Sequence, residues 1–578
     1  MHPLRITVLL VVISLAQPLH NTVAEGPNIF VVNSTGDEAD ASTDDDQCDV
    51  DLSTEGLQCT LRAAIDQANF SPNKGGPDEV HFDIPTANNP NCVVATGVCR
   101  IGSQQGWSVV QPVLIDGYTQ PGAQPNSNTF SAGSNAVLKV VLDGVNAFAG
   151  FGGLTLNPQT PGNTTVRGLV IHRYSNNGLG IQINGSGVRI EGNFIGTDAT
   201  GTLALENSIG VRVIGSGNTI GGLAPRARNV ISGNNNGLQH YVSGATGNTI
   251  LGNYIGTNAS ATEALANNLN GISIYLASGN TIGGEADGAG NLISGNGLDG
   301  IVVLGNSGMP ATGNVIQGNY IGTEADGVGA LGNAGRGIAL FDWANNSSIG
   351  GAATGAGNTI AFNGSNGIRV EGANATGNLI RANSIHSNGV SPAIKGIDTV
   401  SGGNTELAPP VITDVGSASG TACPHCEVDV FSDSVDEGRI YDGTAEADAT
   451  GNWSFPGIVS GPKITATATD SVGNTSGFSQ PFDATNLDSD GDGYTNSRET
   501  DLSEDAGLYC PIMRADVGGD GSVSILDLSA VASAFGQSVP SVPARLDQGL
   551  PADRDGLISI LDLAAVARHF GKLVSACP

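Results

Sequence analysis

A mainly β protein built around a right-handed parallel β-helix is what the sequence predicts, on three observations. One phrase returns with small changes between Asn218 and Asn383, and its form Gly-Asn-aromatic-Ile-Gly-Thr begins at Gly192, Gly252 and Gly318, at intervals of 60 and 66 residues. The short runs inside each period, such as Ile-x-Ile, alternate as half-buried strands do. Gly and Asn, which tolerate positive φ, stand between the runs. A fixed period of short strands separated by turns is the signature of a solenoid.

Stacked coils place like residues over like. We expect about twenty residues in a coil and about three coils in each large period, with about 4.8 Å between coils. The same position of the repeat is occupied by Asn193, Asn253, Asn319 and Asn383. We expect their side-chain amides to form a hydrogen-bonded ladder along the axis, and the alternative is that they bind sugars. The neighbouring place predicts a packing row of Phe194, Tyr254 and Tyr320. The alternative is that aromatic side chains stack on sugars, and it extends to Tyr275, Phe341 and Trp343.

Length and charge restrict the function classes. The chain has 578 residues, a formal net charge of −31 and 85 glycines. It is too long for one hydrophobic core, so a solenoid with additional modules fits. The acidic balance argues against nucleic acid or an anionic membrane as a partner, because phosphate binding needs a positive patch. The same balance fits the binding of cations.

Residues 1–24 have the pattern of a secretory signal peptide. Arg5 supplies the positive charge, residues 6–16 are apolar, and Thr22-Val23-Ala24 is a small-residue cleavage site. A membrane anchor is the alternative, but the apolar run is too short to span a bilayer. We therefore expect a secreted or cell-surface protein with no transmembrane segment once the signal is removed.

Eight cysteines in a secreted chain can pair fully, and an oxidising compartment would keep them bridged. They fall in local couples, which are Cys48 with Cys59, Cys92 with Cys99, Cys423 with Cys426, and Cys510 with Cys577. The CPHC sequence at Cys423–Cys426 could instead be a redox or metal pair. It has no second Cys-x-x-Cys nearby, so a small structural loop is the favoured interpretation.

Residues 25–77 form a segment of their own. FVVNSTGDEAD reads as a strand and an acidic turn, and CTLRAAIDQAN at Cys59–Asn69 has apolar residues at helical spacing. The pair resembles the CSLREA-type N-terminal segment of secreted bacterial β-helix proteins, with Thr60 and Ala63 in place of Ser and Glu. The resemblance implies a cap on the first coil, and an open solenoid end needs one. A cap is favoured over a catalytic role for Arg62 or Asp66.

Residues 78–403 are assigned to the β-helix, and DGYTQPG at Asp116–Gly122 resembles the first coils of the same proteins. The architecture is that of pectate lyases and polygalacturonases, which implies either a calcium-holding acidic cluster with a basic residue or closely placed Asp residues. No adjacent Asp pair or Arg-x-Lys stands on these coils. The charged candidates on the coils are scattered, and we interpret them as a solvated outer face, so the catalytic residues stay unknown. These candidates are His172, Arg173, Arg189, Glu191, Asp198, Arg212, Arg228, His240, Asp299, Arg336, Asp342, Arg369 and Glu371.

A linker at residues 404–410, which ends in two prolines, separates the coils from the next module. Residues 411–482 contain short alternating strands, such as ITATATD at Ile464–Asp470, with Gly and Asn turns between them. This pattern favours a small β-sandwich, and it is similar to bacterial immunoglobulin-like modules. We interpret it as a spacer.

Residues 483–510 contain DSDGDGYTNSRE, which matches the twelve-residue calcium loop D-x-D-x-D-G-x₅-E. Alternate carboxylates, a carbonyl and a final bidentate Glu are the ligands that Ca²⁺ prefers. The ligands are Asp488, Asp490, Asp492, the Tyr494 carbonyl, Asn496 and Glu499. The segment also resembles thrombospondin type 3 repeats.

Residues 511–578 hold two copies of a loop that runs into a helix, with Asp527 and Asp562 set 35 residues apart. The duplication resembles a type I dockerin, which implies calcium and a cohesin-like protein partner. The first loop would use Asp516, Asp520, the Ser522 carbonyl, Ser524 and Asp527, and the second Asp553, Asp555, the Leu557 carbonyl, Ser559 and Asp562. Gly518 and, more seriously, Pro551 depart from the pattern. The apolar pairs Ile525-Leu526 and Ile560-Leu561 could dock a partner or join the two halves.

Three functions remain. The first is a calcium-binding β-helix protein that binds polysaccharide or surface partners and docks through its C-terminal module. The second is a polysaccharide lyase or glycoside hydrolase, which a convergent acidic and basic cluster in one groove would favour. The third is a non-catalytic adhesive or structural surface protein. The sequence favours the first.

Overall fold

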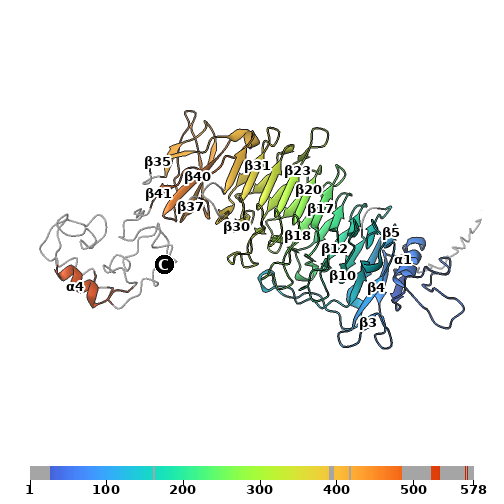
Figure 1. The fold of residues 1–578 in the computed structure, drawn as a ribbon. Helices are drawn as coiled ribbons and strands as arrows, with labels where there is room; N and C mark the ends of the chain where they lie inside the picture. Colours follow the sequence, from blue (N-terminus) through green and yellow to red (C-terminus); the bar gives the residue numbers. More distant parts are fainter. Residues whose placement is uncertain are drawn as a thin grey trace, which may run out of the picture.

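The computed structural model describes residues 26–160, 163–389, 396–414, 418–435, 437–484 and 522–533, together with 566–567 and 569–570. Three long sheets run along one axis and form a parallel β-helix (Figure 1). Each coil adds one strand to every sheet, as β12, β13 and β14 do in one coil and β15, β16 and β17 in the next. The parallel β-helix predicted from the repeat is thus confirmed, while its right-handed sense stays a prediction.

The bounds of the strands follow in spatial order. Sheet A contains β1 (Ile29–Val32), β2 (Asp78–Phe82), β6 (Val113–Asp116), β9 (Thr165–Arg167), β12 (Arg189–Glu191), β15 (Thr219–Gly221), β18 (Thr249–Leu251), β21 (Thr281–Gly283), β25 (Val315–Gln317), β29 (Ser348–Gly350) and β32 (Leu379–Arg381). Sheet B contains β3 (Cys92–Val93), β4 (Val98–Gly102), β7 (Val140–Asp143), β10 (Leu169–His172), β13 (Phe194–Ile195), β16 (Val230–Ile231), β19 (Tyr254–Ile255), β22 (Leu292–Ile293), β26 (Tyr320–Ile321), β30 (Thr359–Ala361) and β33 (Ser384–His386). Sheet C contains β5 (Trp107–Val109), β8 (Leu154–Leu156), β11 (Leu179–Ile183), β14 (Ile209–Val213), β17 (Asn236–Tyr241), β20 (Ile272–Tyr275), β23 (Ile301–Leu304), β27 (Ile338–Phe341), β31 (Ile368–Glu371) and β34 (Ile397–Val400).

Shorter elements lie between the strands of the three long sheets. A two-stranded sheet pairs β24 (Ala311–Thr312) with β28 (Ala344–Asn345). Five short 3₁₀ helices are described, which are η1 (Gly117–Thr119), η2 (Phe130–Ala132), η3 (Gly144–Asn146), η4 (Pro225–Ala227) and η5 (Gly403–Glu406). Apart from the antiparallel pair β3–β4, the described strand pairs within the three long sheets are parallel.

The interior is a set of aliphatic columns. In sheet A the middle residue of each strand is fully buried beneath its neighbour in register, as Ile190, Ile220 and Ile250 are. Burying each such side chain stabilises the fold by about 1.5–3 kcal/mol. The column explains why the Asn-x-Ile phrase repeats, since Ile fills the core and Asn begins the corner.

Asparagine ladders run along the corners between the sheets. The first links Asn193, Asn229, Asn253, Asn291, Asn319, Asn358 and Asn383 through amide-to-amide hydrogen bonds of 2.8–3.2 Å. A second links Asn207, Asn234, Asn267, Asn296, Asn333, Asn363 and Asn388 at 2.8–3.0 Å. The amide nitrogens also donate to backbone carbonyls, as Asn253 does to Ile220. The ladder reading of the Asn positions is therefore confirmed.

The expected coil size was wrong. Successive members of the first ladder are 36, 24, 38, 28, 39 and 25 residues apart. At the corner of Asn218, Asn248, Asn280 and Asn314 the steps are 30, 32 and 34 residues, so each large period holds two coils of about this size and not three coils of about twenty residues. The Asn phrases mark three different corners of a coil, because Asn218, Asn248, Asn280 and Asn314 form a third ladder at another corner.

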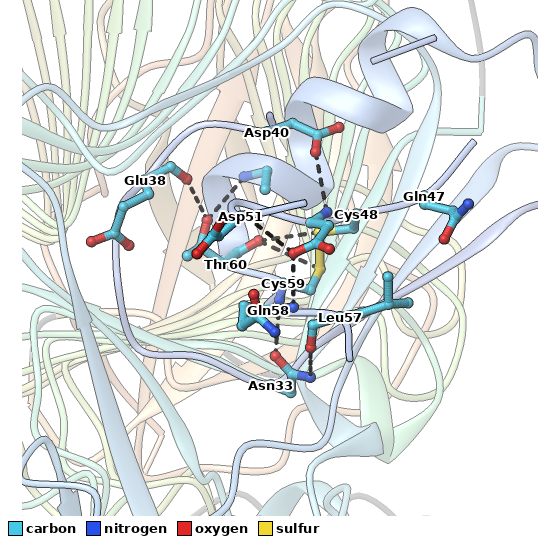
Figure 2. Close-up of a disulfide and its surroundings, with 12 residues drawn as sticks. Asn33, Glu38, Asp40, Gln47, Cys48, Asp51, Leu57, Gln58, Cys59 and Thr60 are labelled. Carbon is cyan, nitrogen blue, oxygen red and sulfur yellow. Dashed lines mark hydrogen bonds between the residues drawn. A yellow bond between two sulfur atoms is a disulfide. The ribbon is translucent and has the colours of Figure 1, made fainter. Parts of the chain in front are cut away.

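The N-terminal segment caps the first coil. Helix α1 (Leu61–Phe70) buries Leu61, Ala64 and Ile65 in the same core as the coils, and Figure 1 shows it at one end of the solenoid. Strand β1 from this segment pairs with β2, so the stack of coils starts at Ile29 and not at the predicted residue 78. The Cys48–Cys59 disulfide ties the start of the helix to the preceding loop (Figure 2). The predicted cap is confirmed.

Disulfides join Cys92 to Cys99 and Cys423 to Cys426, as predicted, so the two cysteines of the CPHC sequence have no free thiolates to bind a metal ion. Cys510 and Cys577 lie outside the described residues. So does the predicted signal peptide at residues 1–24. Among the residues the structure describes, no helix has the length and apolar character that crossing a membrane requires.

The module after the coils consists of two antiparallel sheets around its own core. One sheet contains β35 (Val411–Asp414), β36 (Ser419–Thr421) and β39 (Asn452–Ser454), and the other contains β38 (Ile440–Glu446), β37 (Glu427–Asp433), β40 (Lys463–Thr469) and β41 (Phe482–Asp483). This is the module for which the sequence predicts a β-sandwich. Its immunoglobulin-like topology stays a prediction.

This module is more than the predicted spacer, because it covers the last coil (Figure 1). Glu437 accepts a hydrogen bond of 3.3 Å from the Asn388 backbone, where the second ladder ends. Asn404 follows Asn378 at the corner of the third ladder, and its side-chain amide donates a hydrogen bond of 3.0 Å to the Thr475 carbonyl of the module. The module therefore satisfies polar groups that an open solenoid end would expose.

Candidate functional site

The outer face of sheet C carries a row of apolar side chains in register. Tyr241 pairs with Tyr275, Tyr275 with Leu304, and Leu304 with Phe341. These four residues are called the aromatic row below. Each is the last residue of its strand and lies on the face opposite to the core residue before it, which is His240, Ile274, Val303 or Leu340. Tyr241 is 42% exposed, and the other three are half-buried.

The corner that follows the row is conformationally unusual. Val242, Leu276 and Asp342, which directly follow Tyr241, Tyr275 and Phe341, have φ values of 76°, 60° and 48°. Positive φ is disfavoured for bulky side chains, and most of all for a β-branched residue such as Val. The chain accepts this strain directly after three of the four residues of the aromatic row, whereas Leu304 is followed by Gly305.

Arginines flank the aromatic row. The Arg212 guanidinium lies 5.6 Å from the centre of the Tyr241 ring, and the Arg336 guanidinium lies 5.4 Å from that of Phe341. Such cation–π contacts are worth about 0.5–1 kcal/mol at exposed sites. They also hold the planar faces of the side chains in a defined orientation.

The three arginines on this face differ in their partners. Arg336 pairs with Asp299 at 3.4 Å, and Arg369 pairs with Glu371 at 2.9 Å and with Asp398 at 3.1 Å. Arg212 donates instead to the neutral Gln239 amide at 3.0 Å, and no described carboxylate pairs with it. Burial lowers the pKa of Arg212, but an arginine starts so high that it stays charged. Arg212 is thus a cation open to an anionic ligand group.

The equivalent aromatic side chains on sheet B are covered by the protein itself. The segment from Gln124 to Val137 folds over them, and its Phe130 ring lies 5.4 Å from the Tyr254 ring and 5.6 Å from the Tyr320 ring. Arg228 stacks on Tyr254 at 4.7 Å and donates to the Thr129 and Gly133 carbonyls. The predicted packing row of Phe194, Tyr254 and Tyr320 is confirmed, with aliphatic residues between its members. This removes sheet B as a sugar platform.

The scattered charged candidates separate into groups. Arg212, Asp299, Arg336, Arg369 and Glu371 are spread along sheet C between β14 and β31, whereas Arg189 and Glu191 pair on sheet A at 2.6 Å. Asp198 binds the backbone of its own turn. His240 lies in the core with neither ring nitrogen hydrogen-bonded, and burial lowers its pKa to about 3. His240 is therefore a neutral core residue and no catalytic candidate.

His172 and Arg173 come together with Asp143 at the first coils. Arg173 Nε donates to Asp143 at 2.8 Å, and His172 Nδ1 lies 3.7 Å from the same carboxylate. Burial lowers the pKa of His172 to about 4, so the ring is neutral at pH 7. Burial alone would raise the pKa of Asp143, but the hydrogen bond and charge of Arg173 and the other donors lower it.

Most predicted calcium ligands lie outside the described residues. These are Asp488, Asp490, Asp492, Tyr494, Asn496, Glu499, Asp516, Asp520, Asp553, Asp555, Leu557, Ser559 and Asp562. Ser524 and Asp527 are described at the start of helix α4 (Ile525–Ser533), where the Ser524 hydroxyl lies 3.0 Å from Asp527 Oδ2. Two predicted ligands are therefore adjacent, although a helix cap gives the same contact. In the described ranges no three His, Cys, Asp or Glu side chains are grouped to hold a metal ion.

The sequence identified part of this site. Tyr275, Phe341 and the three arginines were among its candidates, but Tyr241 and Leu304 were not. The signal for Tyr241 was present, because Gly-Leu-Gln-His-Tyr at Gly237–Tyr241 matches Gly-Ile-Ser-Ile-Tyr at Gly271–Tyr275. Both phrases lead into a strained corner.

Comparisons with known proteins give structural likenesses at low identity. No protein-family model and no curated protein matches the chain. The chain is similar to the Dettilon tailspike protein, with 14% identity, coverage of 68% of this chain and 71% of that one, and a TM-score of 0.34. It is similar to the A-module of a mannuronan C-5 epimerase from Azotobacter vinelandii, with 16% identity, coverage of 59% and 94%, and a TM-score of 0.26. It is similar to a tailspike double mutant of Escherichia coli bacteriophage HK620 in complex with a pentasaccharide, with 11% identity, coverage of 71% and 88%, and a TM-score of 0.19. At these values nothing about function follows from the likeness.

Proposed function

We propose that this protein binds a polysaccharide along the aromatic row on the outer face of sheet C. The observation that supports it is the contrast between two faces of one solenoid. On sheet B the chain covers its aromatic rings with Phe130 and Arg228, whereas on sheet C the rings of Tyr241, Tyr275 and Phe341 remain partly exposed. Exposed aromatic rings in a fixed orientation are the usual platform for a ligand with one apolar face and polar edges.

The repeat of the solenoid fits a polymeric ligand. Each coil advances about 4.8 Å along the axis, so the row offers the same contact on successive coils to a chain that runs along the helix. Ser273, Val302 and Ala339, which are in register beside the row, are small and buried.

The charge on this face favours an acidic polysaccharide. Arg336 and Arg369 are engaged with carboxylates of the protein, and Arg212 is the cation without one in the described part of the face. A guanidinium matches a carboxylate or sulfate through two parallel hydrogen bonds. Arg212 would therefore select anionic sugars while the aromatic row supplies most of the contact area.

The test is a glycan array followed by titration of each glycan that binds. Tyr275→Ala and Phe341→Ala should each weaken binding about tenfold, which corresponds to about 1.4 kcal/mol. Phe148→Ala is the matched control, because Phe148 is 49% exposed and lies outside this face. If neither variant weakens binding more than the control does, the aromatic row is not the site. If no glycan binds, a structural or adhesive role is favoured.

A polysaccharide lyase or glycoside hydrolase is the second candidate function. It is favoured by the acidic and basic cluster of Asp143, His172 and Arg173. Two features weigh against proton transfer there, because Asp143 is held ionised by Arg173 and His172 is buried and neutral. Release of unsaturated or reducing sugars from acidic polysaccharides by the purified protein, and its loss in Asp143→Asn, would support this candidate.

We also propose, from the sequence, that the C-terminal segments bind Ca²⁺ and that the last module docks the protein to a cohesin-like partner outside the cell. Docking is supported by Ile525 and Leu526, which are 66% and 65% exposed on helix α4. Co-purification of a cohesin module with the full chain, and its loss in Leu526→Asp, is the test. A Leu526→Asp protein that still retains the cohesin would remove this surface from consideration.

A further inference from the structure

A cleft of about 750 Å³ lies between the N-terminal cap and the first coils. It is formed by residues that the aromatic row does not use. Its walls are Thr35, Asp37, Glu38, Asn91, Arg100, Gly102, Ser103, Gln104, Asp143, Val145, Asn146 and Arg173. No aromatic side chain lines it, so stacking cannot dominate recognition there, and hydrogen bonds and charge must.

One wall is built by the motif at the start of helix α1. The Thr60 hydroxyl accepts from the Ala63 backbone at 3.0 Å as the helix cap and donates to the Glu38 carbonyl at 2.6 Å. Arg62 binds Asp37 through Nε at 3.1 Å and Nη2 at 3.0 Å. Figure 2 shows Thr60 beside the disulfide, with the loop that carries Glu38 next to it. The acidic loop is thus fixed by Thr60 and Arg62, two residues at the start of helix α1.

The same arginine joins the loop to the coils. Arg62 Nη2 also donates to the Ser103 hydroxyl at 2.8 Å and to the Gly106 carbonyl at 2.9 Å. Its bonds therefore reach both sides of the cleft and hold Asp37 at a set distance from the first coil. A charge-assisted network of this kind is rigid, and rigidity lowers the cost of binding a ligand.

The opposite wall is held in the same way. Asp143 ends strand β7 and accepts hydrogen bonds from the Val145 backbone at 3.1 Å and from Arg173 Nε at 2.8 Å. Arg173 reaches this position with a φ of 64°, a conformation that costs an ordinary residue about 1–2 kcal/mol. Two of the three carboxylates that line the cleft, those of Asp37 and Asp143, are therefore each paired with an arginine and fixed as hydrogen-bond acceptors, and Glu38 is the third.

Arg100 differs from the other cleft arginines. It is exposed on strand β4, it lines the cleft, and the ion pairs described for the other arginines do not include it. Asn146 and Gln104 add amide groups around it, and the Asn91 amide donates to the Thr35 hydroxyl at 3.1 Å. The cleft thus combines one available cation with fixed acceptors and neutral donors.

We infer that this cleft binds a hydroxyl-rich ligand with one anionic group, with Arg100 on the anion and Asp37 and Asp143 accepting from hydroxyls. Carboxylate and sulfate are both suitable anions for a guanidinium. A sugar acid and a sugar sulfate share this chemistry. The inference is independent of polysaccharide binding at the aromatic row, because the two sites have no residue in common.

The experiment compares three sugars that differ only at the sixth carbon. Glucuronate, glucose 6-sulfate and glucose are titrated into the full-length protein and followed by saturation-transfer NMR. At least one anionic sugar should bind tenfold or more tightly than glucose, and which one does so identifies the anion. Equal binding of all three sugars, or of none, overturns the inference.

Two variants locate the binding. Arg100→Gln should weaken binding of the anionic sugar at least tenfold without lowering the melting temperature, because Arg100 is exposed and has no described ion pair. Arg226→Gln, at an exposed arginine outside both sites, is the matched control and should leave it unchanged. Loss of binding in Arg212→Gln, with Arg100→Gln unaffected, would place the sugar on the aromatic row and overturn the assignment to the cleft.

Discussion

Arg381 and Asp429 form an ion pair across the junction between the last coil and the C-terminal β-module. Arg381 Nε donates to Asp429 Oδ2 at 2.9 Å, and Nη2 donates to Oδ1 at 2.6 Å. The Asp429 side chain is 2% exposed and that of Arg381 13%. Burial alone would lower the pKa of Arg381, but hydrogen bonding and the charges of Asp429 and Glu427 raise it. A fork-shaped pair of this kind fixes the relative orientation of the two parts.

Asp429→Ala should therefore destabilise the junction strongly. The substitution leaves Arg381 charged and half-enclosed, and breaking a buried pair in this way costs about 3–5 kcal/mol. We expect a lower melting temperature and faster proteolysis at the junction. Lys463→Ala, which removes an exposed pair with Asp483, is the control and should cost about 0–1 kcal/mol. Equal melting temperatures for the two variants would contradict a role for the Arg381–Asp429 pair as the lock.

His240 makes the coils sensitive to acid. Its pKa falls from 6.5 to about 3 on burial, so below pH 6.5 the unfolded chain binds a proton that the folded chain does not. The free energy of unfolding therefore decreases as the pH falls from 6.5 towards 3, by up to about 1.4 kcal/mol per pH unit. His172, with a pKa of about 4, acts in the same direction.

His240→Val should flatten this dependence, because the neighbours of His240 in its column are Val213 and Ile274. At pH 5 the variant should gain about 2 kcal/mol over the wild type relative to their difference at pH 7.5. The difference between the two proteins is the readout, because Asp442, whose pKa burial raises to about 6, favours folding at low pH in both. If the wild type and His240→Val differ in stability by the same amount at pH 5 and at pH 7.5, His240 does not titrate as predicted.

The coil architecture could be predicted from the sequence, whereas the coil size could not. Period-two alternation and the recurring Asn fix the strand type and the corners. The number of coils depends on which corner each Asn occupies, and Asn218, Asn229 and Asn234 occupy three different corners. Insertions also fall at different corners of successive coils, so the Asn phrases are irregularly spaced although the third ladder advances by 30, 32 and 34 residues.

The site was harder to predict because exposure depends on distant segments. Tyr254 and Tyr275 look alike in the sequence, yet Tyr254 is covered by Phe130, more than a hundred residues before it, and Tyr275 is not. The cleft also depends on contacts between separate segments, such as that of Arg62 with Ser103, 41 residues further along the chain. Its residue Asp37 reads as part of an acidic turn in the sequence. Only the folded chain distinguishes these residues from their neighbours.

Removal of calcium should destabilise the C-terminal segments and not the solenoid. The predicted ligands Asp488, Asp490 and Glu499 bring several carboxylates together, and without a cation these repel each other. We expect a chelator to lower the temperature of one thermal transition of the full chain. Asp490→Asn should lower the temperature of the same transition. The β-helix transition, whose described residues hold no metal cluster, serves as the internal control. A chelator that leaves every transition unchanged would contradict calcium binding.

Ser347 interrupts the third asparagine ladder. Its backbone N–H donates to the Asn378 side chain at 3.0 Å, as a ladder residue does, but its hydroxyl is buried without a hydrogen bond. The side chains of Asn280 and Asn314 on the coils before it are bonded to each other at 3.3 Å. Ser347→Asn should complete the ladder between Asn314 and Asn378.

The expected gain is about 1–3 kcal/mol, from a new buried hydrogen bond and the loss of an unsatisfied hydroxyl. Chemical denaturation of the two proteins measures it. Ser348→Asn, on the half-buried outer side of β29, is the control and should change stability by less than about 0.5 kcal/mol. Asn291→Ala, which breaks the first ladder by removing the bonds to Asn253, Asn319 and Ile250, should destabilise the protein. If Ser347→Asn also destabilises it, the corner has no room for an amide, and the serine is a steric requirement of that coil.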